Sequence, residues 1–153
     1  MYDKEGAADY PDYRKLSADL LFKWNGFSLL AEYVNATANG LNGLYVEKDE
    51  GAKLKPRQIA NYLALGNGLN VQAGYLFRKL WALDVAYSKV NPEWKETGQS
   101  VLREADNITF GASKYFNNNT FKLQLAGSYT SYNQLVGAGS KEFQVKLNLH
   151  ILF

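Results

Sequence analysis

The last eleven residues of the chain read Phe143-Gln-Val-Lys-Leu-Asn-Leu-His-Ile-Leu-Phe153, in which apolar and polar side chains alternate as far as Ile151. Successive side chains of a β-strand point to opposite faces, so this segment predicts a strand with one apolar and one polar face. Its length is about what a tilted strand needs to cross a bilayer, whereas a strand in a soluble domain is typically about five or six residues long. The segment therefore favours a transmembrane strand over the long edge of a soluble sheet.

The composition is that of one domain rich in aromatic residues. The 153 residues carry 17 basic and 15 acidic side chains, a balance that gives no field strong enough to indicate nucleic acid as a partner. Eleven tyrosines, eight phenylalanines and three tryptophans suit the aromatic girdles of a membrane barrel, although soluble β-domains also favour aromatics. The absence of cysteine excludes a disulfide framework and a thiolate metal site.

The sequence has no apolar run long enough for a transmembrane helix, and its first residues lack the pattern of a signal peptide. A barrel that reaches an outer membrane must be exported, so we expect the chain to be mature or truncated and Met1 not to be its natural beginning.

Period-two segments recur along the chain and predict strands joined by turns. Asn25-Gly26 is the strongest turn signal, because both central residues of a tight hairpin need positive φ. Arg78-Lys79 and Asn117–Asn119 are the other predicted tight turns, and Gly66-Asn67-Gly68 is a further turn signal inside a long polar stretch. The predicted strands cover residues 16–24, 27–37, 70–77, 80–90, 105–116, 120–131 and 143–153.

The predicted connections alternate between short turns and long loops. The long loops cover residues 38–69, 91–103 and 132–141, and residues 1–15 form an N-terminal loop or a poor strand. Outer-membrane barrels show this alternation, with short turns on the periplasmic side. Such barrels have an even strand count, so the seven predicted strands indicate either that residues 1–15 add a poor eighth strand or that the chain is the C-terminal part of a larger barrel, and the loop-like composition of residues 1–15 favours the larger barrel. The predicted fold is thus an all-β, antiparallel transmembrane β-barrel.

The polar positions of the predicted strands are expected to line a pore. Acidic and basic groups are mixed among them, which predicts weak selectivity. Glu32 and Asp84 could act as general acid and base, but charges that brace a barrel wall against Lys23 or Lys122 are much commoner. We expect no catalytic residue, no cofactor and no metal, since a single histidine offers no ligand set. The predicted pore-lining residues are Asp19, Lys23, Glu32, Asp84, Lys122, Gln124, Lys146 and His150.

Several segments, taken in order, resemble the C-terminal half of the phosphate-selective porin O and P type family of bacterial outer-membrane channels. They are residues 18–33 (ADLLFKWNGFSLLAEY), 71–75 (VQAGY), 86–92 (AYSKVNP), 106–111 (DNITFG) and 121–125 (FKLQL), together with the terminal Phe153. The resemblance implies a porin of about twice this length, usually a homotrimer, that passes anions or small hydrophilic solutes. It also implies that Phe153 is an assembly signal read by the barrel-insertion machinery. The family's ladders of Arg and Lys are not matched by the mixed charges predicted here, which argues against phosphate specificity.

Three functions remain open at this point. The first is a passive channel in the bacterial outer membrane, in contact with its lipid, with the 38–69 loop folded inward. The second is a small closed eight-stranded barrel with a structural or adhesive role, whose interior would have to pack or pair the charged residues. The third is a soluble lipocalin-like barrel, which fits the terminal strand poorly because its bulky row would have to point inward.

Overall fold

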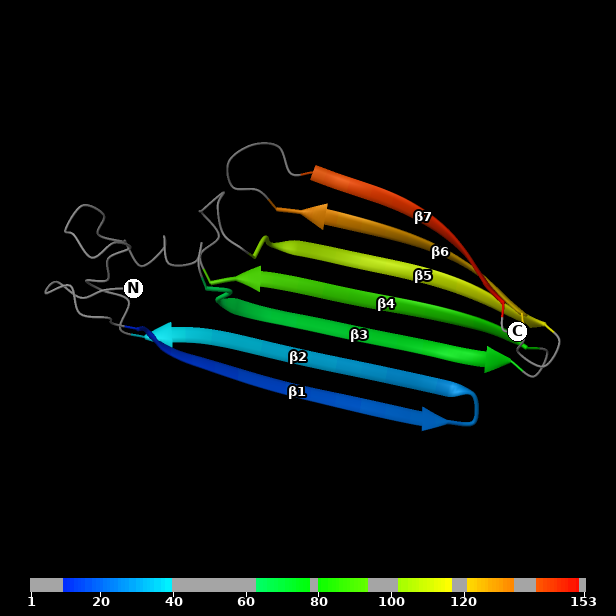
Figure 1. Ribbon diagram of the computed structural model, residues 1–153, viewed down its shortest axis with the longest axis horizontal. Helices are drawn as coiled ribbons and strands as arrows, with labels where there is room; N and C mark the ends of the chain where they lie inside the picture. Colours follow the sequence, from blue (N-terminus) through cyan, green and yellow to red (C-terminus); the bar gives the residue numbers. More distant parts are fainter. Residues whose placement is uncertain are drawn as a thin grey trace, which may run out of the picture.

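The computed structural model describes residues 10–39, 63–77, 80–93, 102–116, 121–133 and 140–151. These residues form seven β-strands, as the period-two pattern predicts, and Figure 1 shows them side by side. The strands are β1 (Asp12–Trp24), β2 (Phe27–Asn39), β3 (Gly66–Phe77), β4 (Trp81–Pro92), β5 (Ala105–Phe116), β6 (Phe121–Tyr132) and β7 (Ser140–Ile151).

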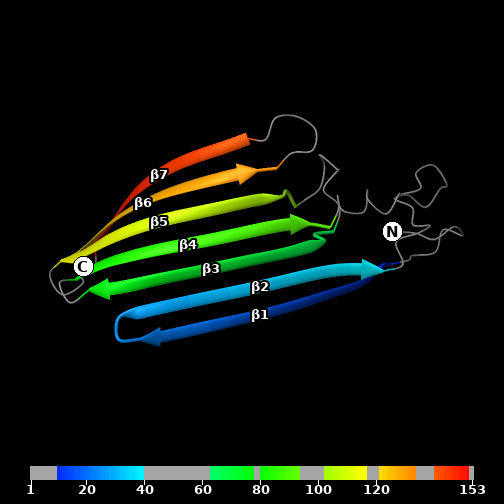
Figure 2. The ribbon, with the colours of Figure 1, turned by 180° about the vertical axis from the view of Figure 1, so that it is seen from behind.

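The strands make one antiparallel sheet in the order of the chain, β1-β2-β3-β4-β5-β6-β7. Each strand pairs only with its neighbours in sequence, and β1 and β7 form the two edges, as both broad views show (Figures 1 and 2). The expectation of a closed barrel is therefore not met by the described strands, which form an open sheet. With seven strands in alternating directions, β1 and β7 run the same way, so they cannot join in an antiparallel ladder.

The hairpin between β1 and β2 confirms the predicted Asn25-Gly26 turn. Asn25 has φ of 44° and Gly26 has φ of 87°, the left-handed conformations that this two-residue turn requires. Gly26 is also held from the next strand, because the Leu76 amide donates a hydrogen bond of 2.8 Å to the Gly26 carbonyl. The other predicted short turns, at residues 78–79 and 117–119, lie outside the described residues.

Several strands extend beyond their predicted bounds because they pair with long neighbours. Gly66-Asn67-Gly68 is not a turn: these residues open β3 and pair with β2 and with residues 90–92 of β4. Gly66 has φ of 139° and lies so close to Asn91 and Pro92 that a side chain would overlap their backbone. Likewise β1 begins at Asp12 rather than Leu16, and β7 begins at Ser140 rather than Phe143.

The pairing register sorts the side chains of all seven strands onto two contrasting faces. On one face, three successive rows across the sheet contain no charged residue, and we call them the apolar belt. Its rows are Leu20-Ala31-Val71-Tyr87-Ile108-Tyr129-Phe143, Phe22-Leu29-Ala73-Val85-Phe110-Gly127-Val145 and Trp24-Phe27-Tyr75-Leu83-Ala112-Leu125-Leu147. The opposite side, called the polar face, carries the other half of each strand.

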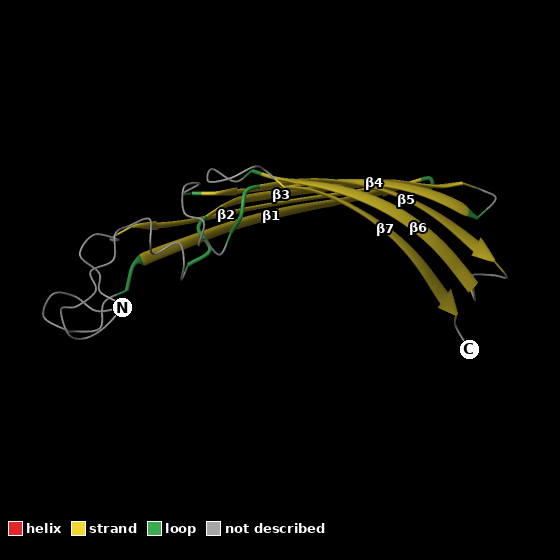
Figure 3. Ribbon diagram, turned by 90° about the horizontal axis from the view of Figure 1, so that it is seen from above, coloured by secondary structure: helices red, strands yellow, loops and turns green. Residues whose placement is uncertain are grey.

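The described residues bury very little. Leu65, which precedes β3, is 1 % exposed, but the other buried apolar side chains are alanines. Phe110 is 61 % exposed and Leu147 is 68 % exposed, so the apolar belt is not covered by other described residues. The sheet is twisted and curved, most strongly at β5, β6 and β7 (Figure 3). A contiguous exposed apolar surface of this kind indicates contact with a membrane or another molecule.

Candidate functional site

All eight residues predicted to line a pore lie on the polar face. The register places Lys23, Asp84 and Lys146 in one row across the sheet, and Asp19 and Glu32 opposite each other in another. Lys122 and His150 are paired across β6 and β7, next to the pair Gln124 and Asn148. The structure thus brings together on one surface groups that are spread over five strands of the sequence.

The polar face is hollowed. A depression of about 640 Å³ extends from β1 to β6 and is lined mainly by small and polar side chains. Its lining includes Lys23, Ser28, Asn70, Gln72, Lys122 and Gln124. The polar face is therefore a broad polar depression rather than a flat surface.

Asp84 lies at the centre of this hollow, between two glycines on the neighbouring strands. Gly74 faces it from β3 and Gly111 from β5 in the register. A Cβ atom at Gly74 would overlap Oδ1 of Asp84, and one at Gly111 would come within 3.7 Å of the Asp84 Cβ. The two glycines leave room for the carboxylate to lie across the sheet surface.

The predicted bracing of the wall by ion pairs is not what the described residues form. Their ion pairs are Arg14–Asp12 at 3.1 Å and Lys89–Asp106 at 3.4 Å, and neither includes a predicted pore-lining residue. Glu32 instead accepts a hydrogen bond of 2.7 Å from the Asn70 side-chain amide. A neutral donor, the Asn70 amide, therefore lies beside Glu32 where a lysine was expected.

Amide and hydroxyl side chains continue the row that starts at Asp19 and Glu32. Asn107 donates a hydrogen bond of 2.6 Å to the Thr130 hydroxyl and accepts one of 3.1 Å from the Thr109 hydroxyl. The alternation in their strands predicts this face for all three, although they are not among the predicted pore-lining residues. Tyr115 was also missed; its ring lies 5.3 Å from the Lys122 Nζ, on the same face.

The apolar belt ends at a polar cluster on each side. Towards the long loops, Asp106 accepts a hydrogen bond of 2.7 Å from the Tyr87 hydroxyl and pairs with Lys89. Towards the short turns, Lys114 lies with its Nζ 4.6 Å from the ring centre of Trp81 and 5.8 Å from that of Phe116. No sequence pattern finds these clusters, because their members meet across strands.

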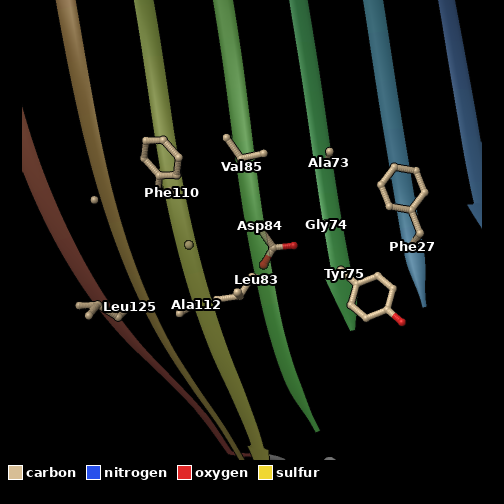
Figure 4. Close-up of a pocket in the computed structure, with 12 residues that line it drawn as sticks. Phe27, Ala73, Gly74, Tyr75, Leu83, Asp84, Val85, Phe110, Ala112 and Leu125 are labelled. Carbon is tan, nitrogen blue, oxygen red and sulfur yellow. The ribbon is translucent and has the colours of Figure 1, made fainter. Parts of the chain in front are cut away.

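A shallow groove of about 530 Å³ interrupts the apolar belt over β3, β4 and β5. Figure 4 shows its walls, with Phe27 and Tyr75 on one side and Phe110 and Leu125 on the other. Its floor is low because small residues from three strands, Ala73, Ala112 and Gly127, fall in two adjacent rows. Gly74, Asp84 and Gly111 border both this groove and the polar hollow, so the two depressions lie back to back across the sheet.

The described residues offer no group of three or more histidine, cysteine or acidic side chains suited to a metal ion. In the part of the chain that the structure describes, no helix is long and apolar enough to span a membrane. Phe153, the predicted assembly signal, lies outside the described residues. The arrangement therefore offers two surfaces of opposite character, and no described cluster positions a nucleophile beside a base.

The chain was compared with models of protein families, with curated proteins and with solved structures, and none of them matches it. A relationship to porins is therefore a proposal that rests on the residues alone.

Proposed function

We propose that this chain forms part of the wall of an outer-membrane channel of the porin type. The apolar belt faces lipid, the polar face lines a water-filled lumen, and small hydrophilic solutes or anions diffuse through with weak selectivity. The observation that carries the proposal is the apolar belt itself: three rows across all seven strands without a charged residue on one face, whereas the opposite face carries charged and amide side chains as well as a few exposed apolar ones such as Leu21.

The height of the apolar belt supports this position. Trp81 and Lys89 mark its two limits on β4, eight residues apart. At about 3.3 Å per residue this is about 26 Å along the strand, or about 20 Å once a strand is tilted by roughly 40°. The apolar band of outer-membrane barrels is about 25 Å tall. Aromatic residues near both limits, Tyr87 and Tyr129 at one and Trp81 and Phe116 at the other, fit the interfacial girdles.

Weak selectivity follows from the charges of the polar face. The described strands place four negative charges there, at Asp19, Glu32, Asp84 and Glu142, and four positive ones, at Lys15, Lys23, Lys122 and Lys146. A lumen that presents both signs attracts neither cations nor anions strongly. Passage of phosphate as a specific substrate would call for a cluster of basic side chains, which the described part of the polar face does not contain.

Closure of the barrel requires strands in addition to the seven described. An open edge leaves backbone N–H and C=O groups without partners in lipid, which costs several kcal/mol for each group. Because β1 and β7 run in the same direction, an odd number of further strands is needed to join them by antiparallel ladders. One further strand would close a small eight-stranded barrel and a larger odd number a porin-sized one; we propose the larger barrel because the polar face carries charged side chains that a small, filled interior would have to pack or pair.

The natural lack of cysteine allows a direct test. Single cysteines placed at Val145, Lys146, Leu147 and Asn148 in the full chain, expressed in outer membranes, are treated with a charged maleimide that does not enter lipid. We expect Lys146→Cys and Asn148→Cys to react and Val145→Cys and Leu147→Cys to stay unmodified. Equal reaction at all four positions would contradict the membrane position.

Single-channel recording tests the channel itself. The refolded protein in a planar bilayer is expected to give stable conductance steps and a small reversal potential under a salt gradient. Silence after confirmed insertion would remove the channel role for this chain and leave a structural barrel wall.

A further inference from the structure

The groove in the apolar belt lies directly beside the cation at the short-turn end of the sheet. Ala112 is part of the groove floor, and Lys114 follows it on the same face of β5. Leu83 of the groove wall and Trp81 are related in the same way on β4. An apolar groove with a positive charge at one end is complementary to an amphiphile with an anionic head group.

Lys114 is held in a suitable place for this role. Its ammonium lies over the face of Trp81 and near Phe116, so that its apolar stem is packed and its charge stays at the limit of the belt. The other basic side chains that the described strands place on this face, Arg14, Lys89 and Lys141, are at the long-loop end. Among the described residues, Lys114 is therefore the basic side chain next to the groove on the short-turn side.

The groove itself has the lining of a lipid-chain site rather than of a polar ligand. Its volume of about 530 Å³ is comparable to small-molecule sites, and its walls on the belt side are aromatic and aliphatic. Small residues at Ala73, Ala112 and Gly127 make the floor, while Phe110, 61 % exposed, projects beside it. The lining comes from five strands, β2 to β6, but from only two rows of the belt, so a flexible chain would fill this depression by lying across the strands.

We propose that the groove holds one acyl chain of an anionic phospholipid whose phosphate is bound by Lys114. Trp81 takes part by orienting the ammonium, which lies 4.6 Å from its ring centre. This inference rests on the membrane position proposed above and adds a lipid class and a location, the leaflet on the short-turn side.

The test measures quenching of Trp81 by brominated lipid. The full chain, with Trp24→Phe and Trp94→Phe so that Trp81 is the one fluorophore of its kind, is reconstituted in mixed phosphatidylcholine and phosphatidylglycerol vesicles. Bromine is placed on the acyl chains of one lipid or of the other at equal mole fraction. We expect phosphatidylglycerol to be enriched at Trp81 by about fivefold, the preference that one lysine at an anionic headgroup supplies.

Matched variants separate the two parts of the site. Lys114→Gln is expected to abolish the preference, whereas Lys141→Gln, on the same face at the other end, leaves it unchanged. Ala112→Leu fills the groove and lowers quenching by both lipids, whereas Ala31→Leu, on the same face outside the groove, does not. Equal quenching by the two lipids in the parent protein would overturn the inference without any variant.

Two further outcomes are distinguished by a second reporter. A chain that keeps only Trp24, on the same face at the end of β1, reports insertion independently of the groove. If Trp24 is not quenched by either lipid, the membrane position fails and the lipid site fails with it. If Trp24 is quenched but Trp81 is shielded from both lipids and the protein cross-links to itself, a second copy covers the groove and the lipid site alone is overturned.

Discussion

The carboxylate of Asp84 lies against the backbone of Gly74 on the neighbouring strand, so closely that a Cβ at Gly74 would overlap Asp84 Oδ1. The contact is possible because residue 74 has no side chain, and it lies on the floor of the polar hollow. Asp84 is exposed, and its terminal oxygens can rotate away. The absence of a side chain at residue 74 therefore affects how the Asp84 carboxylate is oriented in the polar hollow more than it affects the stability of the sheet.

Gly74 is buried, but the atoms that a Cβ there would meet belong to movable side chains, so Gly74→Ala is expected to change the free energy of unfolding by no more than about 1 kcal/mol. The added methyl group meets a movable carboxylate and the Ser28 hydroxyl, 3.1 Å away, rather than backbone. Urea unfolding of the reconstituted protein, followed by tryptophan fluorescence, measures this change. A loss larger than about 2 kcal/mol would show that Asp84 is fixed by its surroundings.

Gly66→Ala is the contrasting substitution. Gly66 has φ of 139°, and a Cβ there would overlap the Asn91 carbonyl oxygen and crowd Pro92. Both neighbours are backbone atoms, so neither can move without displacing β4. We expect a loss of more than about 1 kcal/mol in the same unfolding assay. A neutral result would mean that the start of β3 is free to separate from β4.

Gly26→Ala tests the hairpin between β1 and β2. The residue has φ of 87°, and a Cβ would lie 2.7 Å from the Leu76 carbonyl oxygen. The substitution strains the turn and the hydrogen bond from the Leu76 amide, so we expect destabilisation by more than about 1 kcal/mol. Asn25→Gly, which relieves a left-handed non-glycine residue beside it, is the control and is expected to be close to neutral.

Leu147→Arg tests the sidedness of β7 through stability. Leu147 lies in the apolar belt and is 68 % exposed, so a membrane position would place the new charge in lipid. Leu147 shares its row with Leu83, two residues from the belt limit at Trp81, so the expected cost in vesicles lies between the about 0–1 kcal/mol of an interfacial position and the about 2–4 kcal/mol of the midplane. Asn148→Arg, one position further and on the polar face, is the matched control and is expected to cost little. Equal costs for the two variants would argue against a lipid-facing belt.

Asp84→Asn tests the lumen. Removing this negative charge from the polar hollow is expected to shift the reversal potential towards anion preference, by less than about fivefold in permeability ratio because the charges are hydrated. Lys122→Gln is expected to shift it the other way, and Lys141→Gln, on the opposite face, to leave it unchanged. If the Lys141 variant shifts selectivity as much as Asp84→Asn does, the assignment of the faces is wrong.

The sequence predicts the strands and their two faces because each depends on local information. Alternation within β6 and β7 assigns Lys122, Gln124 and Lys146 to one face without knowledge of any partner strand. The Asn25-Gly26 turn is equally local. The extra length of β3 cannot be predicted from local information. Gly66-Asn67-Gly68 has the composition of a turn, and only pairing with β2 and β4 keeps it extended.

The groove and the polar clusters at the two ends of the belt cannot be predicted from the sequence either, because their members come from different strands. Ala73, Ala112 and Gly127 come from three strands and form a floor only after the register brings their rows together. Lys114 meets Trp81 across β4 and β5, 33 residues apart in the chain, so no motif marks the contact. The described residues do not form the predicted ion pair between Asp84 and Lys23, because Ser28 and Gly74 lie between them in the same row.

The order of the strands in the sheet, identical to their order in the chain, has a consequence for how the protein is assembled. Every ladder joins consecutive strands, so a strand needs only the one before it to find its place. The entropy lost on closing each connection is then limited to one loop at a time, and a growing sheet can be extended one hairpin at a time. Folding can accordingly begin at any of the hairpins and extend to either side, since no ladder waits for a strand from elsewhere in the described sheet.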